Sequence, residues 1–424
     1  MTAAMRESVA GPRPQELRLA VVTPSAVPAA TLWVSAPARD GVAPTTPLLG
    51  LPLARRVALS AFRAGFARVL FEAASGSDLS GALSRTGAEV VPPSGPFPEI
   101  PPGRLVLLAP GVIPQVAWLK SLLARPVETG VFLLDADETV ALVDSARGRE
   151  VLAALAAKAP GVAWEAAAAG SPARAPLSSP AQAIVVRGRL DLPRAERWLL
   201  QSLVKETDGF FTRHFERPIS LSITRRLAAT RFSPNAMTIL SVGVGLAGAA
   251  LFLSSAAAFQ FAGALLFVLQ SILDDCDGEL ARVRFEESRF GGVLDFWGDN
   301  VVHSAVFGCL AIGWSRASGD PRPLLAGAAA IAGTLLSAGF VFRYAMRGAR
   351  EGPQFTSVTS APAGRLSRMA DMLARRDFIY LVVLLSAFGK ARWFLALAAF
   401  GAPLFFVLLV AMEASGRRRG RSPS

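Results

Sequence analysis

Residues 273–299 read LDDCDGELARVRFEESRFGGVLDFWGD and place four aspartates, Asp274, Asp277, Asp295 and Asp299, at the edges of apolar segments. The first two are three residues apart and the last two are four apart, so each pair lies on one face of a helix. If the two helices pack side by side, the four carboxylates converge on one pocket. A carboxylate at membrane depth costs about 2.5–3.5 kcal/mol, so four together need a compensating cation.

An all-carboxylate site favours a hard divalent cation, magnesium or manganese. Two such ions about 3.5–4 Å apart can hold a phosphate between its attacking and leaving oxygens. The alternative is that these aspartates lie in water at the membrane surface and pair with Arg282, Arg284 or Arg289. The two cysteines, Cys276 and Cys309, are too few for a disulfide framework or a zinc site.

The 424-residue chain is 52% apolar and carries a formal charge of +12. This composition disfavours a wholly soluble protein. A basic balance beside long apolar runs indicates anionic lipid as the partner, and we find no nucleic-acid-binding motif. We also expect no signal peptide, because the first residues contain no long uninterrupted apolar core.

The C-terminal half, residues 233–424, is predicted to be an all-α six-helix transmembrane domain. Residues 236–273 contain no charged residue, which is enough for two crossings of about 20 residues each. The four further candidate spans are 291–315, 323–342, 378–389 and 393–412.

Basic residues predict the orientation of this domain. Seven arginines lie between Arg343 and Arg376, whereas the loops on the opposite side are short and carry two basic residues each. The positive-inside rule then places both termini, the N-terminal domain and the 275–290 loop in the cytoplasm, in a multi-pass protein of the cell (inner) membrane. Residues 201–232 are predicted to be a linker followed by an amphipathic helix, 217–232, on the cytoplasmic surface.

Residues 1–200 are predicted to form a cytosolic α/β domain. Short apolar runs alternate with amphipathic stretches such as 53–66, which favours a parallel sheet flanked by helices. The runs expected to be strands are 17–22, 67–74, 104–110, 129–138 and 183–188. The Pro/Ala/Ser-rich stretch 167–182 is expected to be a loop.

The aspartate region resembles the signature of the CDP-alcohol phosphatidyltransferase family, DxxDGxxAR followed by GxxxDxxxD. All eight fixed positions match, and they are Asp274, Asp277, Gly278, Ala281, Arg282, Gly291, Asp295 and Asp299, with Arg282 and Gly291 separated by eight residues. The resemblance implies a six-helix membrane enzyme that moves a substituted phosphate from a CDP-alcohol to an acceptor hydroxyl and releases CMP. It also implies a homodimer.

The same resemblance assigns roles to the matching residues. It implies that Asp274, Asp277 and Asp295 bind two Mg²⁺ or Mn²⁺ ions, with Asp299 close to them as the usual candidate for the base. The residues that would line the CDP pocket are Gly278, Ala281 and Arg282, together with Asn235 and Thr238 of a PNxxT-like element.

These roles agree with the chemistry of the residues. The acceptor hydroxyl must lose a proton as it attacks phosphorus, and a carboxylate such as Asp299 or Asp295 beside a dication can take it. Loop arginines Arg343, Arg375 and Arg376 could bind an anionic acceptor such as an inositol phosphate, or could serve only as positive-inside anchors. His303 and Ser304, one turn beyond Asp299, are read as packing residues.

The junction at 195–241 resembles that of the bifunctional inositol-1-phosphate cytidylyltransferase and di-inositol-phosphate phosphate synthase proteins, which implies a nucleotidyltransferase-like first domain. A nucleotidyltransferase holds its triphosphate on a glycine-rich turn and a nearby lysine. Here residues 22–50 contain no GxG, and no lysine precedes Lys120. Asp135, Asp137 and Asp191 remain as possible metal ligands. We therefore expect a retained fold that has lost cytidylyl transfer; the alternatives are a bifunctional enzyme and a non-catalytic membrane scaffold.

Overall fold

The computed structural model describes residues 30–36, 41–73, 79–92, 103–125, 131–135, 139–144, 173–177, 182–204, 208–348 and 378–419. The chain divides into two compact units, and each is described by itself. One unit comprises Met1–Arg39 and Ser60–Ala183, and the other comprises Asp40–Leu59 and Ile184–Ser424. This division differs from a boundary near residue 200, because residues 40–59 belong to the second unit.

The first unit is built on a seven-stranded sheet with the order β10-β8-β9-β6-β1-β4-β5. Its strands are β1 (Ala30–Val34), β4 (Arg68–Glu72), β5 (Glu89–Val91), β6 (Arg104–Leu108), β8 (Val131–Asp135), β9 (Val140–Asp144) and β10 (Ala173–Leu177). Strand β1 runs parallel to β4 and β6, and it is buried along its whole length. The alternation of apolar runs and amphipathic stretches therefore predicts the parallel sheet and three of its strands, β4, β6 and β8, but misses β1, β5, β9 and β10.

Two features of the sheet differ from the prediction. Strand β9 is antiparallel to β6 and β8, because only residues 136–139 separate β8 from β9 and a parallel crossover needs a dozen or more. Strand β10 lies within the predicted loop 167–182. It is an edge strand, where the missing amide of Pro176 is tolerated. The predicted strand 17–22 lies outside the described residues.

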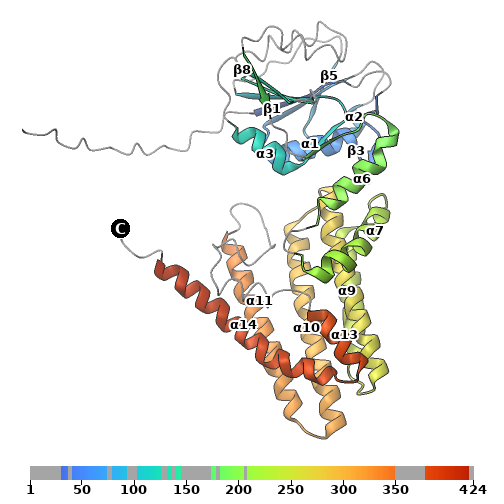
Figure 1. Ribbon diagram of the computed structural model, residues 1–424, viewed down its shortest axis with the longest axis vertical. Helices are drawn as coiled ribbons and strands as arrows, with labels where there is room; N and C mark the ends of the chain where they lie inside the picture. The colour runs from blue at the N-terminus through green and yellow to red at the C-terminus, as the bar shows by residue number, and fades with distance from the viewer. Residues whose placement is uncertain are drawn as a thin grey trace, which may run out of the picture. The chain divides into compact units, whose positions relative to one another are not determined.

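Short elements complete the N-terminal half of the chain. They are the hairpin strands β2 (Pro47–Leu48) and β3 (Leu51–Pro52), α1 (Leu53–Ala64), α2 (Leu79–Ala82), β7 (Val112–Pro114), α3 (Val116–Ala124) and β11 (Ala183–Val185). Helix α3 lies along one face of the sheet (Figure 1) and buries Trp118, Leu119 and Leu122. The predicted strand 183–188 is thus shortened to β11, which is outside the large sheet.

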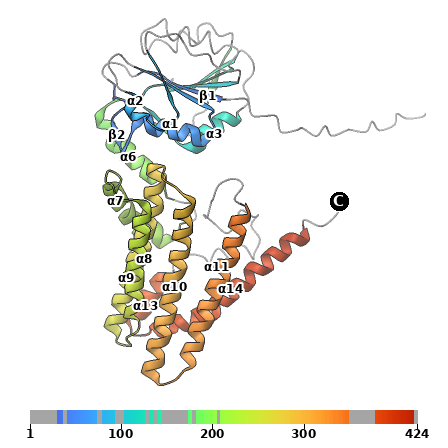
Figure 2. The same ribbon diagram turned by 180° about the vertical axis from the view of Figure 1, so that it is seen from behind.

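The second unit is helical apart from the hairpin β2–β3, which lies within residues 40–59, and the C-terminal part of β11. Its elements are η1 (Arg189–Asp191), α6 (Leu192–Gln201), η2 (Thr212–Glu216), α7 (Arg217–Leu227), α8 (Pro234–Leu251), α9 (Ala257–Arg284), α10 (Arg289–Ser318), α11 (Arg322–Gly348), α13 (Phe378–Ala387) and α14 (Ala391–Arg419). Helices α8, α9 and α10 run side by side, and α11 and α14 pack on each other next to α10 (Figures 1 and 2).

Four of the described helices are long and apolar enough to cross a membrane by length and composition. They are α8, α9, α11 (through Arg343) and α14. Helix α13 has 10 residues, which is fewer than a membrane crossing requires. The predicted span 378–389 is also too short for a full crossing. That α10 also crosses, which the six-span count requires, stays a prediction.

Local capping sets the helix ends near the aspartates. The Ser233 side chain accepts a hydrogen bond from the Ala236 amide at 3.2 Å and begins α8, and Ser288 accepts one from the Gly291 amide at 3.0 Å and begins α10. Phe285 takes a left-handed conformation, with φ 60°, and ends α9. Only residues 285–288 therefore connect α9 to α10.

Small residues let α8 and α9 approach closely. A Cβ added at Gly263 of α9 would lie 2.7 Å from the Gly248 carbonyl oxygen of α8, and one added at Gly248 would lie 3.0 Å from the Gly263 carbonyl oxygen. Such contacts are the main source of attraction between helices in lipid, where no hydrophobic effect drives their association.

The substitution Gly263→Ala tests this contact. The added methyl group must push α8 away, so we expect the free energy of unfolding in detergent to fall by about 1–3 kcal/mol. The control is Gly243→Ala on α8, because nothing lies within 4 Å of a Cβ built there. Thermal unfolding measures both variants, and equal midpoints for the two would contradict the close packing.

Candidate active site and metal centre

The short α9–α10 connection sets how far along each helix the aspartates lie from the connected ends. Asp277 lies seven residues before the last residue of α9, and Asp295 lies six residues after the first residue of α10. At 1.5 Å per residue both are about 10 Å from the connected ends, so they face each other at the same depth.

Three of the four aspartates converge in the structure. Carboxylate oxygens of Asp274, Asp277 and Asp295 all lie within 4.8 Å of one another. Asp274 and Asp277 are buried, and Asp295 is half-buried. Three negative charges at this separation repel one another strongly, whereas a hard cation with oxygen ligands binds them all. The donor set therefore fits Mg²⁺ or Mn²⁺.

Neutral donors orient the carboxylates around this cluster. Thr238 of α8 donates a hydrogen bond to Asp277 Oδ2 at 2.5 Å. Asp299, which is not one of the three converging carboxylates, accepts a hydrogen bond from Gln270 Nε2 at 2.9 Å. Asp299 thus contacts α9 and lies one turn after Asp295 on α10.

The glycines of the signature bring α10 close to α8. A Cβ added at Gly291 would lie 2.9 Å from Asn235 Oδ1, and one added at Gly298 would lie 2.7 Å from Val242 Cγ2. Both Asn235 and Val242 belong to α8, which also packs along α9. The glycines of α10 therefore pack against α8, which contacts both helices, and the carboxylates of α9 and α10 reach toward each other beside it.

The nucleotide-pocket candidates lie on the last turns of α9. A Cβ added at Gly278 would lie 3.0 Å from Arg282 Nη1, so the glycine leaves room for the guanidinium. Arg282 Nε is buried, and no described residue accepts a hydrogen bond from it. Ala281 is half-buried on the same turns. Thr238 and Asn235 are near Asp277 and Gly291, as described above.

The remaining candidates are separated or lie outside the described residues. Arg343 is exposed at the end of the apolar part of α11, and Arg375 and Arg376 lie outside the described residues. Arg284, one of the partners considered for the aspartates, instead donates to the backbone carbonyls of Leu227, Ala228, Thr230 and Phe232. It therefore ties the end of α9 to the connection between α7 and α8.

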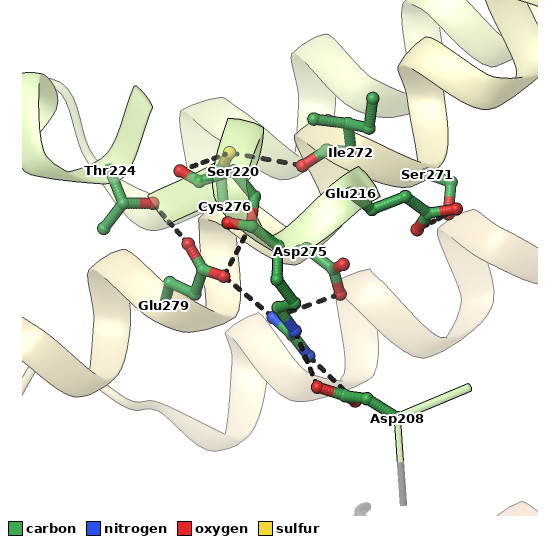
Figure 3. A network of polar contacts seen from close by, with 10 residues as sticks. Asp208, Glu216, Ser220, Thr224, Ser271, Ile272, Asp275, Cys276 and Glu279 are labelled. Carbon is green, nitrogen blue, oxygen red and sulfur yellow. Dashed lines mark hydrogen bonds and ion pairs between the residues drawn. The ribbon is translucent and has the colours of Figure 1, made fainter. Parts of the chain in front are cut away.

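A second set of acids on α9 faces α7. Glu279 is fully buried; Arg217 Nη1 donates to its Oε1 at 2.8 Å, Ser220 donates to the same oxygen at 2.7 Å, and Thr224 donates to Oε2 at 2.7 Å (Figure 3). The predicted amphipathic helix 217–232 thus exists as α7, and one of its faces binds α9 through polar groups.

Arg217 connects this face to further carboxylates. Its Nε and Nη2 donate to Asp208 at 2.8 and 3.1 Å, and its Nη1 lies 3.6 Å from Asp275 Oδ1. Burial alone lowers the pKa of Arg217, but the hydrogen bond to Asp208 and the charges of Asp275, Asp208 and Glu279 raise the pKa above its ordinary value. The guanidinium therefore stays charged.

Sequence reasoning missed the role of these residues. The available signal was that Asp275 and Glu279, four residues apart, share a helix face that is not the face of Asp274 and Asp277. A buried face with its own acids requires a cationic partner, and Arg217 at the start of α7 supplies it.

Comparisons with known proteins agree with this geometry. Residues 231–416 match the family model of CDP-alcohol phosphatidyltransferase. The chain is 37% identical over 122 residues to a bifunctional IPC transferase and DIPP synthase of Thermococcus kodakarensis, which covers 28% of this chain and 27% of that protein. It is 31% identical over 145 residues to a phosphatidylinositol phosphate synthase of Streptomyces avermitilis, which covers 34% of this chain and 55% of that protein.

A crystal structure of Mycobacterium tuberculosis phosphatidylinositol phosphate synthase, in complex with manganese and citrate, aligns with 23% identity and a TM-score of 0.34 over 45% of this chain and 88% of that chain. The sequence match spans little more than a quarter of the length of the Thermococcus protein. Residues 231–416, which match the CDP-alcohol phosphatidyltransferase family model, contain the whole aspartate signature.

Proposed function

We propose that the protein is a membrane transferase that moves a substituted phosphate from a CDP-alcohol to an acceptor hydroxyl and releases CMP. The observation that carries this proposal is the convergence of Asp274, Asp277 and Asp295 within 4.8 Å, on helices that bear the family signature. We place the protein in the cell membrane with this site on the cytoplasmic side, as the arginine distribution predicts, and assembly as a homodimer stays a prediction from the family.

Asp274, Asp277 and Asp295 would hold one or two divalent cations. When bound, these ions would neutralise charge on the pyrophosphate and stabilise the CMP leaving group. The hydroxyl of Thr238 keeps the Asp277 carboxylate turned toward the cluster, since it binds the carboxylate's Oδ2. A non-catalytic scaffold would have no need for this buried set of acids.

Arg282 is the residue that we assign to the donor phosphates. Its buried Nε needs an acceptor, and a phosphate oxygen is a strong one. Gly278 leaves space beside the guanidinium, and Asn235 lies against Gly291 at the opposite helix. We assign Asn235 and Gly278 to the nucleotide for this reason.

Asp299 is the residue that we assign as the base. The acceptor oxygen attacks phosphorus, the bond from phosphorus to the CMP oxygen breaks, and the hydroxyl proton passes to the Asp299 carboxylate. Gln270 donates a hydrogen bond to Asp299 Oδ1 and so orients the carboxylate that would take the proton. The relatives' names suggest an inositol phosphate as the acceptor, and Arg343, Arg375 and Arg376 would bind its phosphate.

We infer that the donor carries hydrocarbon chains. A cavity of about 480 Å³ lies between α10, α11, α13 and α14, with mainly apolar lining that includes Phe307 and Leu381. Asn300 and His303 also line it; on α10, Asn300 is the residue after Asp299 and His303 lies one turn after Asp299. An apolar space that begins beside the proposed base suits an acyl chain better than a soluble CDP-polyol.

The N-terminal half has lost cytidylyl transfer, in our proposal. The amides of Leu53 and Ala54, at the start of α1, donate to the carbonyls of Thr46 and Pro44 in the preceding connection, at 3.0 and 2.9 Å. Two of the amides that would bind a phosphate at this helix end are therefore occupied. Residues 41–52, like the rest of the connection, contain no GxG.

The aspartate cluster can be tested by Asp277→Asn and Asp295→Asn. Each change removes a charged ligand, so we expect metal-dependent CMP release to fall at least about a hundredfold, the scale on which loss of one preorganised electrostatic group slows an enzyme. The control is Asp320→Asn in the connection between α10 and α11. Normal CMP release in both cluster variants would remove the proposed mechanism.

The nature of the donor can be tested with two substrates that share a head group. Purified protein should release CMP from CDP-diacylglycerol and release it at least about tenfold more slowly from CDP-glycerol, because the latter lacks the chains that would fill the apolar cavity. CMP release is measured with inositol 1-phosphate and with glycerol 3-phosphate as acceptors. Equal rates for the two donors would contradict the lipid assignment and favour a soluble CDP-polyol.

The loss of cytidylyl transfer can be tested on the full-length protein. Incubation with CTP, Mg²⁺ and inositol 1-phosphate should give no pyrophosphate above the rate without protein, because the phosphate-binding amides are occupied. The same preparation must release CMP from a CDP-alcohol, which shows that it is folded. Pyrophosphate formation that depends on both substrates would establish the bifunctional alternative.

A further inference from the structure

Residues 41–59 connect to the N-terminal sheet in sequence, yet they are part of the second unit. They contain the hairpin β2–β3, in which Leu48 pairs with Leu51, and the first residues of α1. The two turn residues, Leu49 and Gly50, have φ values of 48° and 79°. Two positive φ values are those of a tight hairpin turn, but leucine rarely adopts one.

The side chain of Leu49 explains why this conformation persists. It is buried in one cluster with Leu200, Ala228, Leu280 and Val283. Leu280 and Val283 belong to the last turns of α9, so burial of Leu49 offsets its backbone strain and joins the hairpin to the helix that carries the signature.

Gly50 makes a second contact with the same region. A Cβ added there would lie 2.0 Å from the Ala228 carbonyl oxygen, which is backbone and cannot move aside. Ala228 ends α7, and its carbonyl also accepts a hydrogen bond from Arg284 of α9 at 3.1 Å. The hairpin turn therefore packs where α7 and α9 are already tied together.

Arg56 makes the third contact and the strongest one. It is 2% exposed, its Nη1 donates to the Val283 carbonyl at 2.9 Å, and its Nη2 donates to the Leu48 carbonyl at 2.8 Å. Its guanidinium also lies over the Phe285 ring at 5.8 Å. A cation on the last carbonyls of a helix satisfies acceptors that have no partner within the helix and complements its dipole.

We propose that residues 41–59 form a clamp on the C-terminal end of α9, with Arg56 as the positioning residue, and that this clamp holds the signature residues in register for the reaction proposed above. Arg282 directly precedes the clamped Val283, and Asp277 lies six residues before it on the same continuous helix. An α-helix transmits a displacement along its length. Loss of the clamp contacts at the C-terminal end of α9 would therefore shift both residues relative to α8 and α10.

The clamp also gives the N-terminal half a role that needs no nucleotide chemistry. The connection between the first described strand and the following helix is the place where nucleotide-binding α/β folds hold phosphate. In this chain the same connection contacts α9, and its carbonyls occupy the amides of α1.

The experiment uses the full-length protein in lipid nanodiscs and compares Arg56→Ala, Arg56→Lys and the wild type. Hydrogen exchange of the amides in 278–284 is measured by mass spectrometry, and Mn²⁺ binding is measured from the electron paramagnetic resonance of free Mn²⁺. We expect Arg56→Ala to speed exchange of these amides at least about tenfold and to raise the Kd for Mn²⁺ about fivefold or more, the lower range for coupling between distant groups. Arg56→Lys, which keeps one charged donor, should recover part of both effects.

The matched control is Arg104→Ala. Arg104 is a half-buried arginine of the N-terminal sheet that also donates to two backbone carbonyls, those of Leu122 and Leu123, all within the first unit. It should leave both α9 exchange and the Kd for Mn²⁺ at wild-type values. Gly50→Ala is a second clamp variant, and it should reproduce the effects of Arg56→Ala in case that variant fails to fold.

Wild-type exchange and wild-type Mn²⁺ affinity in the folded clamp variants would overturn the proposal. Equal changes in Arg104→Ala would also overturn it, because the effect would then be general destabilisation. If the wild-type protein bound no Mn²⁺, the proposed function would fail, whereas the exchange measurement would still decide whether the clamp exists.

Discussion

The site depends on one constraint, the fixed orientation of α9 about its own axis. At 100° per residue, Asp274 and Asp277 point one way and Asp275 and Glu279 point to the other side. Glu279 has no exposed surface and accepts three hydrogen bonds from α7, one of them charged. Removing a buried carboxylate from its partner costs about 3–5 kcal/mol, so α9 cannot turn without losing this energy. The other pair is thereby held toward α10.

Helix α8 then sets the distance across which the carboxylates meet. Gly248 and Gly263 bring α9 onto one side of it, and Gly298 brings α10 onto the other through Val242. Direct packing of α9 on α10 would fill the space between the aspartates with backbone and side chains. With α8 as the shared neighbour, Asp277 and Asp295 approach from separate helices, as the proposed binding of a cation between them requires. In the proposed reaction, the small residues would therefore matter for the site as well as for stability.

The sequence predicts this site well because its information is local. The spacing of the aspartates sets their helix faces, and a four-residue connection sets their depth, so the convergence of Asp277 with Asp295 follows from helix geometry. What the sequence does not predict depends on distant partners. The acids Asp275 and Glu279 on one face of α9 indicate a cationic partner, but the sequence does not identify that partner as Arg217, 62 residues before Glu279. The antiparallel β9 could have been inferred from its short connection to β8, whereas the hairpin at Leu49 could not, because its partners lie in α9.

In each half of the chain, the protein's own groups bind the unpaired backbone groups at one helix end. A helix end leaves backbone groups without partners, and proteins satisfy them with side chains, loops or ligands. At the start of α1 the chain's own carbonyls occupy the amides that a nucleotide would otherwise bind. At the end of α9 the guanidinium of Arg56 occupies the Val283 carbonyl and the guanidinium of Arg284 binds four carbonyls of the α7–α8 connection. Both ends are closed by the protein itself, so in the proposed reaction the substrate would meet the carboxylates and Arg282 in the middle of the signature.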